Sequence, residues 1–237
     1  MKKTPSAIPY YQLRFQVLPG PRTERHAKDL AKFCLRHHVE EVALFFAAED
    51  WNNGLFSRKD ENVWFEAIRK TKRILDKAGL AVSLNPWMTV LGPGRGRSFP
   101  PDRKFVPGVS PLGEVSKATA SFADPAWRQY IWNLYGRFAR LGFRVIWVED
   151  DFRYHNHSPL TWGMGFDELT IKRFSEKIGQ PATREEIVRN ILAPGKPHPW
   201  RKLWMQNWYE IQREVALGLA KAVRDNSPGD TQMGLMS

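Results

Sequence analysis

Three consecutive carboxylates follow a short apolar run near the middle of the chain. The run covers residues 145–148, and Glu149, Asp150 and Asp151 come directly after it. We expect the run to be an internal strand of a parallel sheet, because such strands are buried on both faces. In parallel α/β folds, catalytic groups collect at the carboxyl ends of the strands. The three carboxylates are therefore the candidate catalytic residues.

Other predicted strand ends also carry polar or aromatic residues. Carboxylates and amides bind vicinal hydroxyls in pairs, and an exposed indole ring can serve as a platform for the apolar face of a sugar. Cleaving a glycosidic bond needs one carboxyl as proton donor and a second as nucleophile or base. These residue types predict a polyhydroxylated substrate. The candidate substrate-binding residues are Glu49, Asp50, Trp51, Asn85, Trp87, Arg153, His155, Asn156, His157 and Trp162.

Some of these residues have other interpretations. Glu49 and Asp50 are as well explained by a structural cap or by ion pairs with the basic residues 58–59. His155 and His157 with Asp151 have side chains that suit a metal, but Pro159 soon follows and favours a loop, so their spacing is weak support. We expect no metal and no cofactor.

Strand and helix patterns alternate along the chain. A helix needs apolar residues at intervals of three or four, and short β-branched runs favour strands. Between the fourth strand and residue 183 we expect irregular structure. The predicted strands are 13–18, 42–46, 80–84, 145–148 and the start of a fifth at 231–236. The predicted helices are 23–38, about 60–78 with Asp60 as its N-cap, one capped by Asp124, a short one opened by a capping box at Thr183–Glu186, and a long one over 199–224.

The connections from helices to strands differ in length from those that lead from strands to helices. Helix-to-strand turns are tight, whereas the segments after the third and fourth strands are long. Enlarged loops on the carboxyl-end face are typical of a (β/α)8 TIM barrel. Because only four to five of the eight βα units are visible, we expect residues 1–237 to be the amino-terminal part of a barrel domain. An open doubly wound sheet is the alternative.

The amino-acid composition limits the kinds of partner that we expect. The formal net charge is +11, but the basic residues are dispersed, which argues against a nucleic-acid partner. No apolar run is long enough to cross a membrane and no signal-peptide pattern begins the chain, so we expect a cytoplasmic protein. Cys34 lies in a helical pattern and is predicted to be a core residue. An uncovered fifth strand would favour a homo-oligomer.

Four segments together resemble a known family. They are residues 83–87, 147–153, 155–157 and 162–163, and they are similar to the start of bacterial glycoside hydrolases of the β-galactosidase-like (clan A) kind. The resemblance implies a TIM barrel, a sugar substrate and a retaining two-carboxylate mechanism. It also implies an acid/base after the fourth strand and a nucleophile after the seventh, beyond Ser237. Clan A enzymes usually have Asn-Glu after strand four, where this chain has Glu149, Asp150 and Asp151.

The sequence thus predicts a glycoside hydrolase that acts on a glycoside, oligosaccharide or polysaccharide. Asp150 or Asp151 is the preferred general acid/base, and Glu149 is the third candidate. Without a second carboxylate, these residues alone would hydrolyse sugars poorly or not at all. The alternatives are a metal-dependent sugar isomerase or aldolase on the same fold and a non-catalytic carbohydrate-binding protein.

Overall fold

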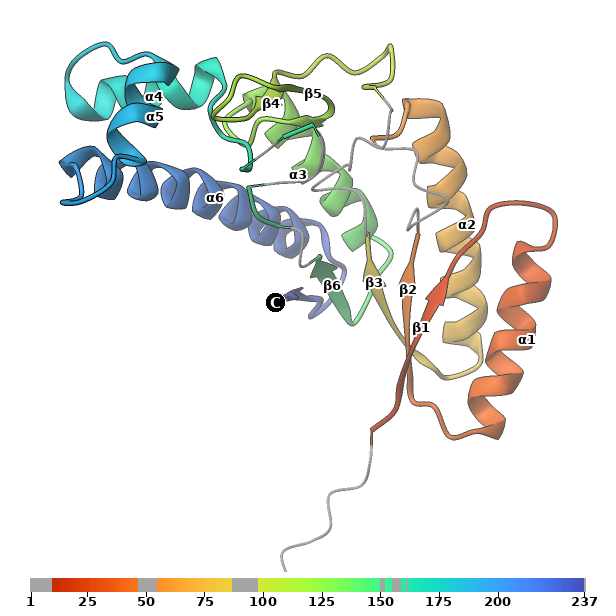
Figure 1. The fold of residues 1–237 in the computed structure, drawn as a ribbon. Helices are drawn as coiled ribbons and strands as arrows, with labels where there is room; N and C mark the ends of the chain where they lie inside the picture. The colour runs from red at the N-terminus through yellow and green to blue at the C-terminus, as the bar shows by residue number, and fades with distance from the viewer. Residues whose placement is uncertain are drawn as a thin grey trace, which may run out of the picture.

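The structure is a computed structural model that describes residues 10–46, 55–86, 98–149, 152–154, 159–160 and 162–236. Within these residues, strands and helices alternate along the chain (Figure 1). The elements are β1 (Gln12–Gln16), α1 (Thr23–Arg36), β2 (Glu41–Phe45), α2 (Arg58–Lys77), β3 (Ala81–Asn85), β4 (Pro107–Val109), β5 (Val115–Ala120), α3 (Pro125–Ala139), β6 (Val145–Val148), α4 (Glu168–Ile178), α5 (Arg184–Ile191), α6 (Pro199–Asn226) and β7 (Gln232–Leu235).

The main sheet has five parallel strands in the order β1-β2-β3-β6-β7. Each new strand pairs with the strand before it, and the order never reverses. A doubly wound sheet has such a reversal, so the alternative fold predicted from the sequence is wrong. The predicted internal position of Val145–Val148 is confirmed, because β6 pairs with β3 on one side and with β7 on the other.

The helices α1, α2, α3 and α6 form an arc around one side of this sheet (Figure 1). This is the arrangement of consecutive right-handed βαβ units, each of which returns its helix to the same face. The described residues contain five of the eight strands that a (β/α)8 barrel needs. The predicted fifth strand is confirmed as β7, which follows α6 and pairs with β6 over four residues.

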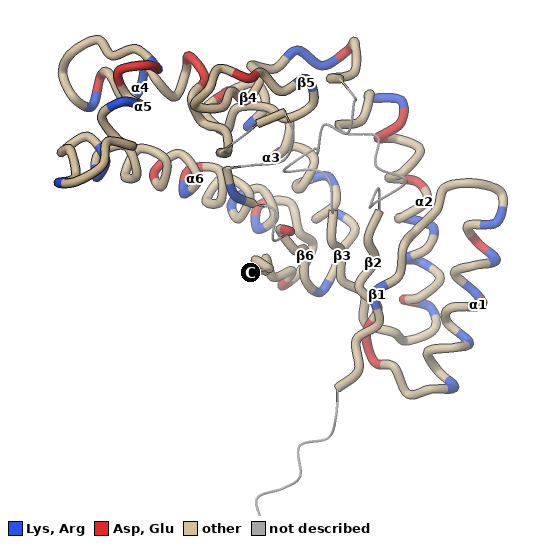
Figure 2. Tube along the Cα trace, in the orientation of Figure 1, with Lys and Arg blue, Asp and Glu red and all other residues tan. Residues whose placement is uncertain are grey.

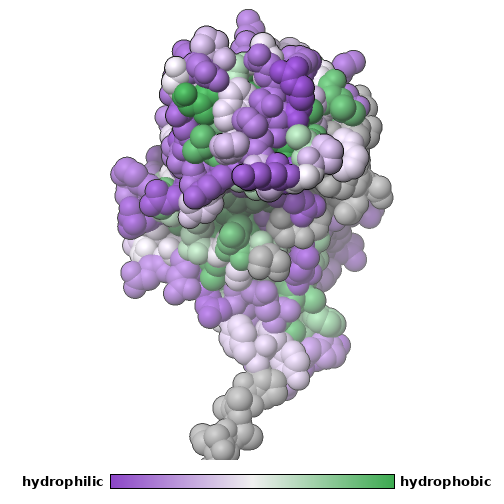
Figure 3. Space-filling model, turned by 60° about the vertical axis from the view of Figure 1, so that its left-hand side comes forward, coloured by the Kyte–Doolittle hydropathy of each residue, from purple (hydrophilic) through white to green (hydrophobic). Residues whose placement is uncertain are grey.

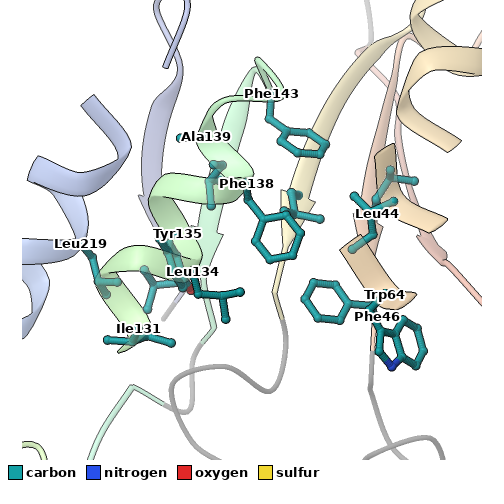
Figure 4. Packing of buried hydrophobic residues seen from close by; sticks show 14 of the residues in the cluster. Leu44, Phe46, Trp64, Ile131, Leu134, Tyr135, Phe138, Ala139, Phe143 and Leu219 are labelled. Atoms are coloured by element: carbon teal, nitrogen blue, oxygen red, sulfur yellow. The ribbon is translucent and has the colours of Figure 1, made fainter. Parts of the chain in front are cut away.

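One hydrophobic core lies between the sheet and the helices. Val42 and Leu44 of β2 point toward the helices and are fully buried. Figure 4 shows Phe138 of α3 extending toward Phe46, and the centroids of these rings are 5.5 Å apart. Trp64 of α2 lies on the other side of Phe46, at 5.7 Å. The prediction that Cys34 is a core residue is also confirmed, since its side chain is buried in this cluster.

Helix ends follow the capping chemistry expected from the sequence, with one correction. Asp124 accepts a hydrogen bond from the amide of Ala126, and Thr183 forms a capping box with Glu186, both as predicted. The N-cap of α2 is Ser57 rather than Asp60. Ser57 lies one turn earlier, and its hydroxyl accepts from the amide of Asp60.

The long loops contain secondary structure that the sequence reading missed. The antiparallel pair β4–β5 lies between β3 and α3, and α4 lies between β6 and α5. The irregular region expected before Thr183 is therefore partly wrong. A second, smaller hydrophobic cluster joins Phe174 of α4 and Ile187 of α5 to Trp204 of α6. These additions lie together at the upper end of the molecule in Figure 1.

Charged residues are spread over the helices. Figure 2 shows Lys and Arg on α1 and α2, interrupted by acidic positions, in agreement with the dispersed pattern read from the sequence. Among the described residues, no helix is both long and apolar enough to cross a membrane.

Candidate active site at the carboxyl ends of the strands

The face of the sheet that points away from the helices carries polar side chains. Successive strand residues point to opposite faces, so the neighbours of the helix-facing Val42, Leu44 and Val82 point the other way. We call this second face the inner face. In Figure 3, seen from the side of α4–α6, the surface is hollowed in the middle and apolar residues gather in the recess. The polar or amphipathic inner-face residues are Gln12, Arg14, Gln16, Glu41, Ser83, Asn85, Trp147 and Glu149.

Asn85 and Glu149 meet at the carboxyl end of this face. Asn85 is the last residue of β3 and Glu149 follows β6, and the two strands are neighbours. The amide Nδ2 of Asn85 donates a hydrogen bond to Oε2 of Glu149 and lies 3.5 Å from Sδ of Met236. Both residues are buried, with 1 % and 5 % of their surface exposed. One amide side chain therefore connects the ends of β3, β6 and β7.

Several polar atoms on the inner face have no hydrogen-bond partner among the described residues. They are Oδ1 of Asn85, Nε1 of Trp147 and Nε2 of Gln16. Buried polar groups are normally paired, and each exception calls for an explanation such as a ligand or water. Together these atoms add one acceptor and two donors to the face that carries the Glu149 carboxylate. A polyhydroxylated molecule could pair with both kinds of group, because each hydroxyl can donate and accept.

The ring of Trp147 is fixed by its neighbours. Gly234 of β7 lies beside it, and a Cβ atom at position 234 would be 2.4 Å from the six-membered ring. The carbonyl of Trp147 also accepts a hydrogen bond of 3.2 Å from the hydroxyl of Tyr135 in α3. The glycine lets β7 pass close to the indole, which places the ring against the inner face.

The described residues after Glu149 are anchored to α6 and to the end of β5. The amide of Phe152 donates to the carbonyl of Glu149 at 3.1 Å, which closes a turn. Tyr154 stacks on Trp208 with ring centroids 4.4 Å apart, and its hydroxyl donates to the carbonyl of Trp208. Phe122 contacts the rings of both Phe152 and Tyr154. Three aromatic contacts therefore position the segment that leaves the candidate catalytic strand end.

A second buried carboxylate lies at the opposite end of the same face. Glu41, at the start of β2, accepts hydrogen bonds from Ser83 and Tyr10 and forms an ion pair with Arg144. Burial raises the pKa of Glu41, but the hydrogen bonds from Ser83, Tyr10 and Gln12 and the charge of Arg144 outweigh it, so the pKa lies below its ordinary value. Three protein groups, Ser83, Tyr10 and Arg144, already pair with this carboxylate, which favours a structural role.

The structure brings together two of the residues predicted from the sequence. Asn85 and Glu149 are in contact, whereas Arg153 is exposed on the anchored segment and Trp162 is exposed in a different place, beside α6. The other predicted residues lie outside the described residues: Glu49, Asp50, Trp51, Trp87, Asp150, Asp151, His155, Asn156 and His157.

Sequence reasoning missed Gln16 and Trp147. Trp147 was treated only as part of an apolar run, although its strand alternation with Ile146 and Val148 places it on the opposite face. The signal on β1 was the polar alternation of Gln12, Arg14 and Gln16, which marks one face of that strand as polar.

No group of three or more His, Cys, Asp or Glu residues within the described ranges lies close enough together to hold a metal ion. The residues considered for a metal from the sequence, Asp151, His155 and His157, lie outside these ranges.

Comparison with known proteins points to one class of fold. No protein family model matches the sequence, and no curated protein matches it either. The solved structures that are similar to this one include two β-galactosidases. The β-galactosidase of the psychrophilic Marinomonas ef1 matches 96 % of this chain with a TM-score of 0.61 and 14 % identity. The β-galactosidase of the Antarctic haloarchaeon Halorubrum lacusprofundi matches 96 % with a TM-score of 0.57 and 15 % identity.

The likeness is one of fold. At these identities it carries no statement about activity. The chain spans 37 % and 36 % of the two β-galactosidase chains, just over a third of each. The fold resemblance expected from the sequence segments is thus supported, and the polar cluster at Asn85 and Glu149 has to be interpreted from its own chemistry.

Proposed function

We propose that this chain forms the amino-terminal part of a (β/α)8 barrel glycoside hydrolase and that its site lies at the carboxyl ends of β3 and β6. The observation that carries the proposal is the buried contact between Asn85 and Glu149, on a face where Oδ1 of Asn85, Nε1 of Trp147 and Nε2 of Gln16 have no hydrogen-bond partner among the described residues. The likeness to two β-galactosidases supports the fold on which this proposal depends.

In this proposal, a carboxyl group after β6 transfers a proton to the glycosidic oxygen while the bond to the leaving group breaks. Glu149 is the described candidate, and Asp150 and Asp151 remain candidates beside it. The Asn85 amide orients the Glu149 carboxylate through Nδ2 and presents Oδ1 to a sugar hydroxyl. The second carboxylate of the retaining mechanism would come from a later strand of the barrel.

The test replaces each carboxylate by its amide and measures turnover of a panel of chromogenic glycosides by the natural full-length protein. Glu149→Gln, Asp150→Asn and Asp151→Asn keep the side-chain size and remove the transferable proton. We expect at least one variant to lose about 10²-fold or more in kcat, the range for loss of a general acid/base. Its melting temperature should stay within a few degrees of the wild type.

Two results would contradict the proposal. One is wild-type turnover in all three variants, which would leave the carboxylates without a catalytic role. The other is the absence of hydrolysis of any glycoside in the panel by the wild-type protein.

A further inference from the structure

A compact aromatic pocket lies outside the candidate active site. Its volume is about 320 Å³, at the lower end of the range for small-ligand sites. Trp162 stands on one side, and Trp204, Met205 and Trp208 of α6 line another. Pro111 in the β4–β5 turn and Leu192 after α5 complete its rim. Three insertions in the long loops thus converge on one concavity.

Trp162 does not have the burial or the backbone conformation expected of a core residue. Its side chain is 79 % exposed, although an indole usually stabilises a fold by being buried. Its backbone has a φ of +67°, a region that bulky residues rarely adopt. Strained backbone of this kind tends to collect at functional sites. An exposed ring at a strained position, lining a pocket, indicates a surface for a ligand.

The polar groups of the pocket are hydrogen-bond donors. Trp204 is 1 % exposed, and its Nε1 has no hydrogen-bond partner among the described residues. Arg201 is fixed by bonds from its guanidinium to the carbonyls of Ile191 and Ala193, after which its positive charge remains at the rim. None of the described residues that line the pocket is Asp or Glu. Flat aromatic surface with a few donors suits a ring that carries hydroxyl and ether oxygens.

The pocket is connected to the segment that follows Glu149. Trp208 contacts the pocket and stacks on Tyr154, and its Nε1 donates to the carbonyl of Gly165 at 3.2 Å. Gly165 has a φ of +98°, and a Cβ atom there would lie 2.7 Å from both Trp208 and Tyr154. Tyr154, Gly165 and Trp208 therefore form one packed unit between the pocket and the candidate catalytic strand end.

We propose that this pocket binds a sugar unit of a carbohydrate chain, at a second site separate from the Asn85–Glu149 cluster. The inference rests on the proposed function in one respect, because the ligand is a further part of the same saccharide. A protein partner fits less well, since a stable protein interface needs upwards of about 1,000 Å² of good complementarity and this concavity is small.

The experiment measures retardation of the protein in native gels containing soluble galactan, xylan, mannan or mixed-linkage glucan. Trp162→Ala removes the exposed ring, and Met205→Glu places a charge at the pocket wall. Tyr209→Glu is the matched control, because Tyr209 is on the same helix, is similarly exposed and does not line the pocket. We expect wild type and Tyr209→Glu to be retarded equally by at least one polysaccharide.

The affinity of the two pocket variants for that polysaccharide should fall by about tenfold or more, which corresponds to a loss of at least about 1.4 kcal/mol of binding free energy. Turnover of a chromogenic monosaccharide glycoside should be unchanged in Met205→Glu, because that substrate is too short to reach a second site. All three variants should melt within a few degrees of the wild type, since the replaced side chains are exposed.

Three outcomes would overturn the pocket proposal: no retardation of the wild type by any of the four polysaccharides, equal losses in Met205→Glu and Tyr209→Glu, or a lower mass of Met205→Glu in light scattering, which would identify a self-association surface. Failure of the proposed function looks different. In that case no glycoside is hydrolysed, while retardation that depends on Trp162 and Met205 persists.

Discussion

The side-chain amide of Asn85 donates a hydrogen bond to the carboxylate of Glu149 across two neighbouring strands, and its own oxygen has no partner among the described residues. A buried acceptor that lacks a partner costs free energy, so such an arrangement is retained where something else completes it. A purely structural role for this pair does not explain why the Asn85 oxygen is buried without a partner, so we expect the pair to take part in ligand binding.

We expect Asn85→Ala to lower kcat/KM by about 10²-fold, the scale of losing one well-placed hydrogen-bond group in an active site. Unfolding free energy should fall by about 1–3 kcal/mol, because Glu149 then loses a buried donor. Ser83→Ala is the control, since Ser83 is on the same strand and face but contacts Glu41. It should lower stability without changing kcat, and equal kinetic losses in both variants would contradict a special role for Asn85.

Asn85→Asp tests the same contact through its charge. The new carboxylate would lie against Glu149, and two adjacent carboxylates raise the pKa of one of them. Because a proton donor must be protonated to act, we expect the basic limb of the pH–kcat profile to move to higher pH in this variant. A profile that matches the wild type would show that Glu149 does not titrate in the reaction.

The buried Glu41 should make stability depend on pH. Its folded-state pKa is lowered below the ordinary value of 4.5, so its contribution is complete above about pH 4.5 and is lost as the pH falls through the folded value. Chemical denaturation at pH 7 and pH 3 should therefore show a smaller acid loss for Glu41→Gln than for the wild type. Glu66→Gln removes an exposed partner of Arg69, which also lowers the pKa of Glu66; because that ion pair is exposed and screened, its acid loss should differ from the wild type much less than that of Glu41→Gln.

The contact between Gly234 and Trp147 predicts a steric effect. Gly234→Ala would place a methyl group 2.4 Å from the indole, and overpacking of this kind typically costs about 1–3 kcal/mol. Combining it with Trp147→Val, which removes the ring, should recover part of the loss in thermal denaturation. Additive losses in the double variant would mean that β7 moves rather than the ring.

The two outer strands of the sheet predict association. β1 and β7 each pair with one neighbour in the described residues, and Leu235 of β7 is 59 % exposed. Unpaired parallel edges and exposed apolar side chains favour pairing with further strands. We expect light scattering of residues 1–237 to show dimers or larger species, and Leu235→Lys to reduce them. A monomer with a cooperative melt would contradict this expectation.

The long, strongly periodic elements could be predicted from the sequence. Apolar spacing located α1, α2, α3 and α6, and capping residues such as Asp124 and Thr183 marked helix starts. The β4–β5 pair could not be found this way, because a three-residue strand such as β4 carries too little pattern. The start of α4 did have a signal, since Asp167 caps it and Gly179 ends it in a left-handed conformation.

The candidate site could be predicted only in part. Asn85 and Glu149 were found because each follows a run that reads as a strand. The register between neighbouring strands determines that these two residues meet and that Gln16 and Trp147 share their face. This register cannot be read from the residue pattern of a single strand. The separate position of Trp162 depends on the insertions α4 and α5, of which only α5 was predicted.

The unreversed strand order has a consequence for how the protein is made. Each strand of the main sheet docks beside the one synthesised before it, so a nascent chain leaving the ribosome always has a partner already in place. Pairings between successive βα units keep loop closure short, which lowers the entropic barrier to folding. Two segments delay the next strand: the one between β3 and β6, which contains β4, β5 and α3, and the longer one between β6 and β7, which contains α4, α5 and α6. Ribosome pausing or a chaperone would therefore matter most while residues 149–231 are being translated.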